Sequence, residues 1–494
     1  MKYYVGADLG TSSLKLMLVD ASGGIIKSVT REYEVIYPAN GWSEQNPAHW
    51  WDAFISGVRE LICGIDKDSV TGIAVAGQMH GLVALDKDDN IIRNAILWND
   101  GRTGNEVEYL NTVVGKETLS DLTANIAFAG FTAPKILWLY ENERDNFDKI
   151  AKIMLPKDYI NYKLTGVHAT DFSDASGMLL LDVKNRCWSK KMLDICRIDE
   201  DVMPTLFESY DNIGTVKADV AELLGLGQGI AVAAGAGDNA AAAIGTGVVG
   251  EGGCNISLGT SGTVFISSEQ FSLDENNALH SFCHADGGYH LMGCILSAAS
   301  CNKWLCDKVY LTNDYARESA RIDDSLLGNN DVYFLPYLMG ERSPLNDTDA
   351  RGMLIGLTPD TGRDKITLAV LEGVAFAIRD NIEVVRKLGI NLRESFLCGG
   401  GARSAVWRKI LASVLDMRLN IPACEEGPGY GAAILAMVAS GNANSVAEAA
   451  VELVSVKETV EPDEALVAKY EEKYKKFKKI YPSVKNLYKA LKEN

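Results

Sequence analysis

The feature of this sequence that most constrains its fold is a four-residue motif that occurs twice in the same setting. Leu-Gly-Thr-Ser stands at residues 9–12 and again at residues 258–261. Each copy lies between two short apolar runs of strand character, so each predicts a strand, a turn and a returning strand. The shared setting favours an internal duplication over coincidence. We therefore expect two domains, one over residues 1–247 and the other over residues 248–494.

Length and composition agree with two large globular domains. The chain has 494 residues, of which 47% are hydrophobic and 8% aromatic, which is typical of packed proteins. Its formal net charge of −18 makes nucleic acid an unsuitable partner, because phosphate backbones attract Lys and Arg. The negative charge does not exclude an anionic nucleotide as a ligand, since backbone N–H groups and Mg²⁺ can neutralise phosphate locally.

Targeting and cysteine patterns predict a soluble, cytoplasmic protein with no membrane contact. The sequence has no secretory signal and no uncharged run long enough to cross a bilayer. Its 10 cysteines contain no Cys-x-x-Cys pair and are expected to be reduced thiols. His280, Cys283, His284 and His290 match no familiar zinc spacing, so we expect structural histidines there. The oligomeric state is not fixed by the sequence, and a homodimer stays open.

Strand and helix patterns alternate, which indicates an α/β fold. In the first half we expect a helix at 50–63 and buried strands at 70–76 and 82–85. A long helix is expected at 364–388. Near the end of the chain, four aromatic residues recur at helical spacing on a Lys-rich helix: Tyr470, Tyr474, Phe477 and Tyr481. This stripe is expected to pack the helix onto the body, with partner binding as the alternative.

Asp8 directly precedes the first copy of the repeated motif. A turn of Gly10, Thr11 and Ser12 offers N–H groups and hydroxyls to phosphate oxygens. A carboxylate beside such a turn is well placed to hold Mg²⁺, usually through water. The alternative is that Asp8 only caps a hairpin turn. The second copy, at Gly259 and Thr260, favours the phosphate-binding interpretation.

A second carboxylate, Asp238, follows a predicted strand within a glycine turn and precedes an alanine-rich helix. It could serve as the helix cap. Its small neighbours leave room for a substrate, which favours a general base that takes the proton from an attacking hydroxyl.

Three other segments place polar or glycine residues at predicted strand ends, where open α/β sheets bind ligands. They are residues 78–81, residues 98–102 and the glycine run 399–401. The glycine run precedes a helix and matches neither a Walker loop nor a dinucleotide-binding motif, so alone it is a weak signal. For His80, a buried structural histidine is the alternative.

Taken together, these motifs resemble the FGGY carbohydrate kinases over nearly the whole chain, from Gly6 to about Ala439. The most specific segments are Ala-Gly-Gln-Met-His-Gly at 76–81, Leu-Trp-Asn-Asp-Gly-Arg at 97–102, Leu-Pro-Lys-Asp-Tyr at 155–159, Gly-Asp-Asn-Ala at 237–240, His-Ser-Phe-Cys-His at 280–284, Phe-Leu-Pro-Tyr at 334–337 and Gly-Glu-Arg at 340–342.

The resemblance implies two ribonuclease-H-like domains of the actin-like ATPase type around a central cleft, with sugar mostly against the first and ATP mostly against the second. It implies that Asp238 is the catalytic base and that Asp8 serves Mg²⁺. The implied sugar contacts are Met79, His80, Trp98, Arg102, Asp238 and Asn239. The implied phosphate contacts are Gly10, Thr11, Ser12, Gly259 and Thr260, and the implied adenosine contacts are Gly400, Gly401 and Ala402.

The substrate implied by the resemblance is a ketopentose. Glycerol-type members usually follow the base with glutamines and lack the Met-His step, whereas this chain has Asn239 and Met79-His80. We expect ATP-dependent phosphorylation of D-xylulose at O5. The alternatives are a kinase for ribulose, gluconate, glycerol or a similar compound, and an actin-like ATPase without a sugar substrate. One departure is Tyr430, where similar members more often carry a small residue.

Overall fold

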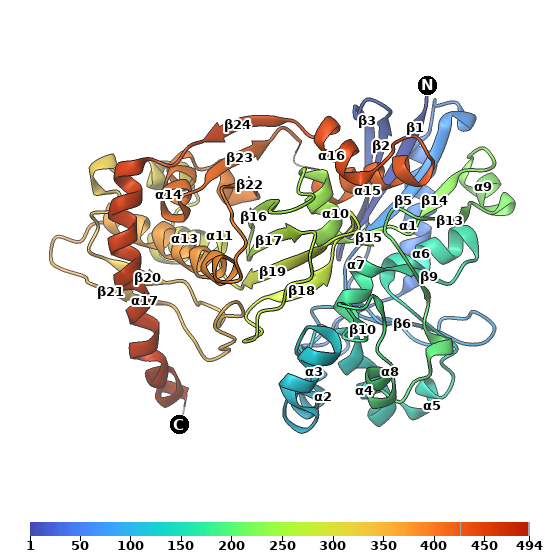
Figure 1. Cartoon of the computed structure of the whole chain (residues 1–494), viewed down its shortest axis with the longest axis horizontal. Coiled ribbons are helices and arrows are strands. Elements are labelled where there is room, and N and C mark those ends of the chain that lie inside the picture. Colours follow the sequence, from blue (N-terminus) through green and yellow to red (C-terminus); the bar gives the residue numbers. More distant parts are fainter. Residues whose placement is uncertain (425, 493–494) are drawn as a thin grey trace.

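The computed structural model describes residues 1–424 and 426–492 of the chain. Two mixed β-sheets lie side by side, each covered by helices (Figure 1). The first sheet has the order β13, β14, β5, β1, β2, β3, with β15 also paired to β5. Its strands are β1 (Tyr3–Leu9), β2 (Ser13–Asp20), β3 (Ile25–Glu32), β5 (Val70–Gly77), β13 (Asn212–Thr215), β14 (Ala231–Ala233) and β15 (Ala236–Gly237).

The second sheet has the order β18, β19, β17, β16, β22, β23, β24. Its strands are β16 (Cys254–Leu258), β17 (Gly262–Ser268), β18 (His280–Cys283), β19 (Tyr289–Ile295), β22 (Glu394–Cys398), β23 (Arg418–Pro422) and β24 (Val456–Val460). Strand β16 is antiparallel to β17 and parallel to β22, just as β1 is antiparallel to β2 and parallel to β5. The strand order therefore repeats, as the duplicated motif predicts.

Helices cover both faces of the first sheet. On one face α1 (Pro47–Leu61) packs on β2 and β3, together with α6 (Pro156–Thr165) and α9 (Ala218–Leu224). Helix α1 begins earlier than the predicted 50–63 because the side chain of Asn46 caps it and Pro47 occupies its first turn. On the other face α15 (Gly427–Ala439) packs on β1 and β5 and against α10 (Asp238–Gly245).

The close approach of α15 to the first sheet explains the glycine at position 6. A Cβ on Gly6 would lie 2.0 Å from the carbonyl oxygen of Gly429, so any side chain there would push the helix off the strand. Helix α16 (Val446–Leu453) joins the same apolar cluster. Thus two helices from the second predicted domain cover the first sheet, and the division after residue 247 stays a prediction.

Tyr430, the departure noted in the sequence, is buried on α15. Its hydroxyl donates to the carbonyl oxygen of Gly23 at 3.0 Å and lies 3.3 Å from that of Leu453. The larger residue thus joins α15 to the β2–β3 turn.

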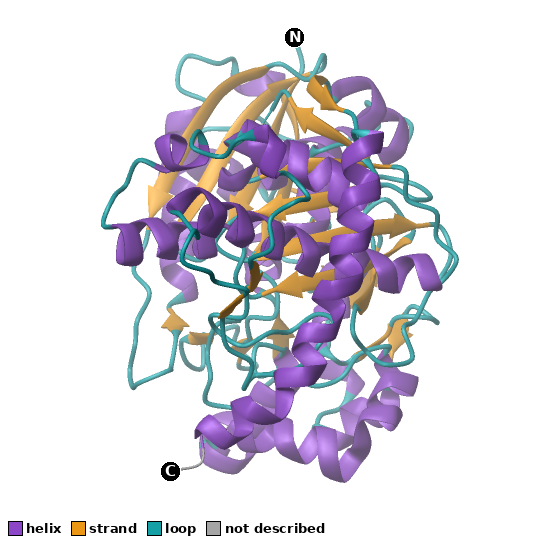
Figure 2. Ribbon diagram, turned by 90° about the vertical axis from the view of Figure 1, so that its left-hand side faces the viewer, coloured by secondary structure: helices purple, strands orange, loops and turns teal. Residues whose placement is uncertain are grey.

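The predicted long helix and the aromatic stripe are both confirmed. Helix α13 (Arg363–Lys387) packs on the second sheet, and α17 (Glu464–Lys492) runs along the outer side of that half (Figure 2). The ring of Phe376 of α13 contacts Tyr470 edge-on and lies tilted against Tyr474 and Phe477 of α17. These contacts hold the last helix on the body.

Shorter elements complete the fold. The remaining helices are α2 (Gly104–Glu108), α3 (Lys116–Thr123), α4 (Thr132–Asn142), α5 (Arg144–Phe147), α7 (Phe172–Ala175), α8 (Lys190–Ile195), α11 (Ala299–Trp304), α12 (Tyr315–Ser319) and α14 (Ala405–Leu415). Short strand pairs are β4 (Glu44–Gln45) with β7 (Ala95–Ile96), β6 (Val83–Leu85) with β8 (Lys152–Met154), β9 (Ala169–Asp171) with β12 (Thr205–Phe207), β10 (Leu181–Asp182) with β11 (Cys187–Trp188), and β20 (Tyr333–Leu335) with β21 (Met353–Ile355).

Two negative findings apply to the described residues. Residues 1–424 and 426–492 contain no helix that is long and apolar enough to cross a membrane. The same residues contain no group of three or more His, Cys, Asp or Glu side chains that could hold a metal ion. His280 instead stacks on Phe282, and His290 stacks on Phe265.

Candidate active site

The carboxyl ends of three neighbouring strands bring the first group of predicted residues together. Asp8 of β1 and Ala236 of β15 both pair with Ala76 of the strand between them, β5. The turn after β1, the segment after β5 and Asp238 after β15 therefore share one edge of the sheet. Two strand spacings separate β1 from β15, or about 10 Å. Helix α10, which follows β15, lies between the two sheets (Figure 1).

Asp238 is the first residue of α10, but it is not the cap of that helix. The capping position is Gly237, which has no side chain to cap with. One oxygen of Asp238, Oδ1, accepts from the backbone N–H of Asn239 at 2.7 Å and from its side-chain amide at 3.1 Å. Burial, with the nearby charge of Asp8, raises the pKa of Asp238 to about 7. This carboxylate can therefore accept a proton near neutral pH.

The turn that carries Asp238 is held by buried polar groups. Lys157 and Asn161 of α6 donate to the carbonyl oxygen of Ala234 at 3.3 and 2.8 Å. The N–H of Gly237 donates to the hydroxyl of Ser173 at 3.2 Å. The turn before Asp238 is thus fixed from two sides, which is the support that a catalytic group requires.

Lys157 also sits among three buried carboxylates. Its Nζ lies 2.6 Å from Asp158, 2.9 Å from Asp171 and 3.9 Å from Asp174, and all four side chains are buried. Burial alone would lower the pKa of Lys157, but the carboxylates raise it above its usual range. Burial raises the pKa of Asp174 well above its usual value, and both of its oxygens lack a hydrogen-bond partner among the described residues. The motif at 155–159 pointed to this region without revealing the cluster.

Asp8 faces the same side of the sheet as α15, and Lys15 is its direct partner on β2. Burial raises the pKa of Asp8 to about 6, while Lys15 opposes the rise. Lys15 also forms an ion pair with Glu426, just before α15. Sequence reasoning missed Lys15 as a site residue, although a lysine inside an apolar strand beside a glycine turn is a usable signal.

The first Gly-Thr turn is held through its carbonyl groups. Tyr33 donates to the carbonyl oxygen of Gly10 at 2.5 Å, and Gln45 donates to that of Thr11 at 2.6 Å. Gln78, after β5, donates to the side-chain oxygen of Gln45 at 3.0 Å. In the described part of the chain, the N–H groups of Thr11 and Ser12 have no acceptor. These free donors are what a phosphate oxygen requires.

Met79 lies beside Asn239, and His80 follows Met79 in the chain. The side-chain amide of Asn239 is 3.8 Å from the sulfur of Met79, and Gly237 leaves the space that Met79 fills. Nδ1 of His80 lies 2.7 Å from the carbonyl oxygen of Gly177. A carbonyl can only accept, so Nδ1 carries the hydrogen and Nε2 is left as an acceptor. Burial lowers the pKa of His80 to about 3, so the ring stays neutral.

Trp98 and Arg102, both predicted sugar contacts, have different surroundings. Trp98 is 47% exposed, and its Nε1 donates to the hydroxyl of Thr11 at 2.9 Å. The side chain of Arg102 is fully buried, where it pairs with Asp100 at 2.7 Å and Glu44 at 2.8 Å. Its guanidinium also lies 3.8 Å from the ring centre of Trp42. The contacts with Asp100 and Glu44 use Nε and Nη2, whereas Nη1 has no hydrogen-bond partner among the described residues. A sugar contact of Arg102 therefore stays a prediction.

The second group of predicted residues lies on the second sheet. Gly259 and Thr260 accept from the backbone N–H groups of Ala299 and Ala298 at 2.8 and 3.0 Å, next to α11. Ser257 of β16 pairs with Cys398 of β22, so the turn after β16 and the glycine run after β22 share one sheet edge.

The glycine run itself requires glycine at its first position. Gly399 has φ of 88°, and a Cβ there would lie 2.7 Å from the backbone of Leu258. Gly400, Gly401 and Ala402 then form a short 3₁₀ helix before α14, and the space around Gly400 is open. The predicted adenosine contacts thus adjoin the predicted phosphate contacts Gly259 and Thr260.

A separate hollow of about 630 Å³ lies away from both groups, where the end of α13 meets the start of α17. It is lined partly by Arg379, Arg386 and Arg393. Arg379 pairs with Glu383 and Glu471, and Arg386 pairs with Glu383. None of the predicted site residues lines this hollow, so it is not part of the candidate site.

Comparison with known proteins places the whole chain in one family. Residues 3–245 match the FGGY family of carbohydrate kinases, N-terminal domain, and residues 254–440 match its C-terminal domain. The xylulose kinase of Escherichia coli strain K12 is 40% identical over 97% of this chain and 98% of its own length.

Solved structures agree with this match. The crystal structure of a "xyloylose kinase" from Brucella ovis superposes with a TM-score of 0.93 at 38% identity, covering 98% of this chain and all of that one. A gluconate kinase from Lactobacillus acidophilus also has a TM-score of 0.93, at 25% identity, with 99% of both chains covered. The two-domain actin-like α/β fold expected from the sequence is confirmed, and the chain belongs to the FGGY family of carbohydrate kinases.

Proposed function

We propose that this protein transfers the γ-phosphoryl group of ATP to O5 of D-xylulose. The observation that carries the proposal is the meeting of Asp238, Asn239 and Met79-His80 at one sheet edge, beside the Asp8 turn. Similarity to proteins named xylulose kinase supports the choice of sugar. The cytoplasmic location and the homodimer stay predictions.

In the proposed reaction, Asp238 takes the proton from the O5 hydroxyl as O5 attacks the γ-phosphorus. The O5–P bond forms, the bond from that phosphorus to the β,γ-bridging oxygen breaks, and ADP leaves. Neutral His80 would accept a hydrogen bond from a sugar hydroxyl through Nε2, and the Asn239 amide would donate one. The N–H groups of both Gly-Thr turns would donate hydrogen bonds to the phosphates and so stabilise their negative charge.

Asp8 is the residue that would hold Mg²⁺. The described residues build no cage of three acidic or histidine ligands, which fits an ion held by one carboxylate together with nucleotide phosphates and water. When bound, the ion would neutralise charge on the phosphates. Gly400, Gly401 and Ala402 would contact the adenosine, with Gly259 and Thr260 at its phosphates.

Lys15 is expected to support phosphate binding. Lys15→Met would remove the cation that faces Asp8 and would leave Glu426 without its partner. The KM for ATP should rise about tenfold, with a smaller change in the KM for sugar. Initial rates with varied ATP measure this, with the exposed Lys149→Met as the matched control. An unchanged KM for ATP would remove Lys15 from the proposed site.

The pH dependence of the rate should report the proton affinity of the base. With the pKa of Asp238 raised to about 7, a growing fraction of the enzyme is protonated and inactive below that pH. At low concentrations of both substrates and excess Mg²⁺, the rate should fall about tenfold per pH unit below pH 7. A flat profile between pH 5 and pH 8 would mean that another group takes the proton.

A kinase for a different ketose or polyol is the second candidate, favoured by the likeness to a gluconate kinase. Comparison of kcat/KM over D-xylulose, ribulose, gluconate and glycerol decides between them. D-xylulose is expected to rank first, and any other order overturns the proposed substrate. ATP hydrolysis that no sugar stimulates would instead favour an actin-like ATPase.

A further inference from the structure

We propose that Lys135, a buried lysine of α4, is a positioning residue for the sugar. Its side-chain nitrogen fixes the backbone of His80 so that the imidazole presents Nε2 to the substrate. The inference rests on the proposed function, in which His80 contacts the sugar. It goes beyond that function because Lys135 itself lies outside the contacts proposed there.

His80 has a backbone conformation that must be imposed on it. Its φ is 69°, in the left-handed region that side chains other than glycine rarely adopt. Residues held there cost about 1–3 kcal/mol and persist only where the surroundings determine them, often at ligand sites. For His80, contacts to both the side chain and the backbone hold this conformation.

On the side chain, the imidazole is held by Gly177 and Phe131. Nδ1 lies 2.7 Å from the carbonyl oxygen of Gly177, and the ring stacks on Phe131 with centroids 4.7 Å apart. A Cβ on Gly177 would lie 2.5 Å from the ring, so glycine is needed for this approach. These contacts set the ring plane and its tautomer.

On the backbone, the carbonyl oxygen of His80 accepts two hydrogen bonds from α4. Nζ of Lys135 donates at 2.8 Å and the hydroxyl of Thr132 donates at 3.0 Å. Both donors are fully buried. Because the orientation of this carbonyl depends on the dihedral angles around His80, the two bonds hold the strained turn in place.

The same side-chain nitrogen also holds a second segment. Nζ of Lys135 donates to the carbonyl oxygen of Gly130 at 2.6 Å. Gly130 presses against Trp98, since a Cβ there would lie 2.5 Å from the carbonyl oxygen of Trp98. One buried amine therefore ties together the segments next to His80 and Trp98, both proposed to face the sugar.

Packing alone does not account for a lysine at this position. Burial lowers the pKa of Lys135 well below its usual value, which means that the charged form is costly there, and Asp100 only partly opposes this. A methionine would fill the same space without that cost. The bonds to the two carbonyls are what the lysine adds.

A double-mutant cycle tests whether Lys135 acts through His80. The single variants are Lys135→Met and His80→Asn, and asparagine is chosen because it tolerates the left-handed conformation. Each should raise the KM for D-xylulose about tenfold while the KM for ATP stays within about twofold. The double variant should be no worse than His80→Asn alone, because the ring that Lys135 positions is already gone.

Three results would overturn the inference. Effects of the two changes that multiply would mean that Lys135 acts independently of His80. Equal increases in both KM values would mean a general loss of structure. A His80→Asn enzyme with normal sugar KM would instead remove His80 from the proposed function, and with it the role of Lys135.

A second variant keeps the test valid if Lys135→Met does not fold, as judged by ADP binding in calorimetry. Thr132→Val removes the other donor to the His80 carbonyl with little change of shape. It should raise the KM for D-xylulose several-fold, again with no added effect in the His80→Asn background. The exposed Lys149→Met in the same half is the matched control and should change neither KM. An unaffected KM in Thr132→Val would overturn the inference.

Discussion

Replacing Asp238 by asparagine is expected to lower kcat by about 10²-fold or more, the contribution typical of a general base. Asparagine keeps the shape and can still hydrogen bond near Asn239, but it cannot accept the proton of O5. The loss should appear in kcat more than in either KM, since the proton moves only in the transition state. A coupled ADP-release assay at pH 8 measures it.

The same substitution should make the protein more stable above neutral pH. The pKa of Asp238 is raised from 3.8 to about 7 in the folded state. The ionised carboxylate therefore opposes folding, by an amount that grows as the pH rises from about 4 to 7 and then stays constant. The neutral amide of the Asp238→Asn variant would remove this cost, so the melting temperature at pH 8 should rise.

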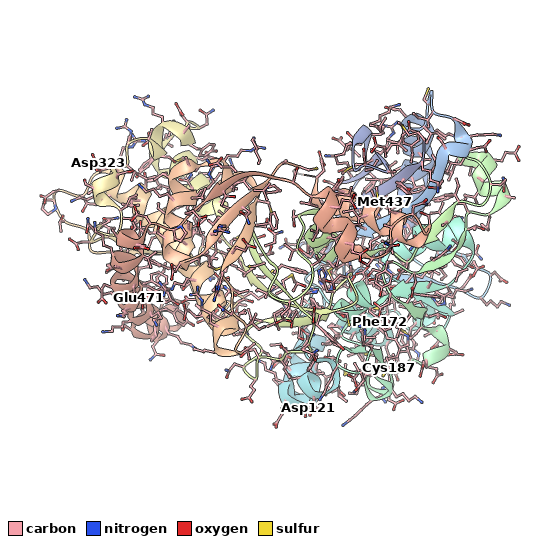
Figure 3. All side chains as sticks on the ribbon, turned by 45° about the horizontal axis from the view of Figure 1, so that its top comes forward. Asp121, Phe172, Cys187, Asp323, Met437 and Glu471 are labelled. Atoms are coloured by element: carbon pink, nitrogen blue, oxygen red, sulfur yellow. The ribbon has the colours of Figure 1, made fainter. Side chains whose placement is uncertain are left out.

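Asp121→Asn is the matched control for the loss of a carboxylate. Asp121 is exposed on α3, at the periphery of the molecule (Figure 3). Its substitution should leave kcat and melting temperature unchanged. Near-normal turnover of a folded Asp238→Asn enzyme would show that Asp238 is not the base.

Among the substitutions proposed for this chain, Lys157→Met is expected to lower the free energy of unfolding the most. The change leaves Asp158, Asp171 and Asp174 buried without the cation they share. Removal of one partner from a buried ion pair costs about 3–5 kcal/mol. Urea unfolding at pH 8 should show a lower midpoint. The value of kcat should fall as well, because the carbonyl of Ala234, in the turn before Asp238, loses a hydrogen-bond donor.

The pH dependence separates this charge effect from a packing effect. Without Lys157, the buried carboxylates must take up protons to remain buried, which is easier in acid. The difference in midpoint between wild type and Lys157→Met should therefore shrink from pH 8 to pH 5. A further change of Asp171→Asn should restore part of the loss. An unchanged midpoint in Lys157→Met would contradict the account of the cluster.

Much of the fold followed from local sequence signals. The repeated Leu-Gly-Thr-Ser motif predicted two related strand-turn-strand units, and the strand order of the two sheets repeats accordingly. The crossing of α15 onto the first sheet could not be predicted, since it depends on a backbone contact between Gly6 and Gly429 that are far apart in sequence.

In the candidate site, too, some residues could be predicted from the sequence and others could not. Asp8 and Asp238 could be selected because each stands at a strand end beside glycine, where the chain itself indicates a ligand. Arg102 stood in a similar setting, and its contacts with Asp100, Glu44 and Trp42 could not be read from the sequence. Lys135 and Lys157 were missed as site residues for the opposite reason. Their roles depend on carbonyls and carboxylates that only the folded chain brings to them.

The central claim is that this site phosphorylates a terminal sugar hydroxyl at the expense of ATP. Phosphorus NMR of a reaction with Mg²⁺, ATP and D-xylulose tests it most directly. The account predicts one phosphomonoester per ADP formed, with its phosphorus coupled to the protons on C5 of the sugar. Formation of ADP with inorganic phosphate alone, or of an ester at another carbon, would contradict it.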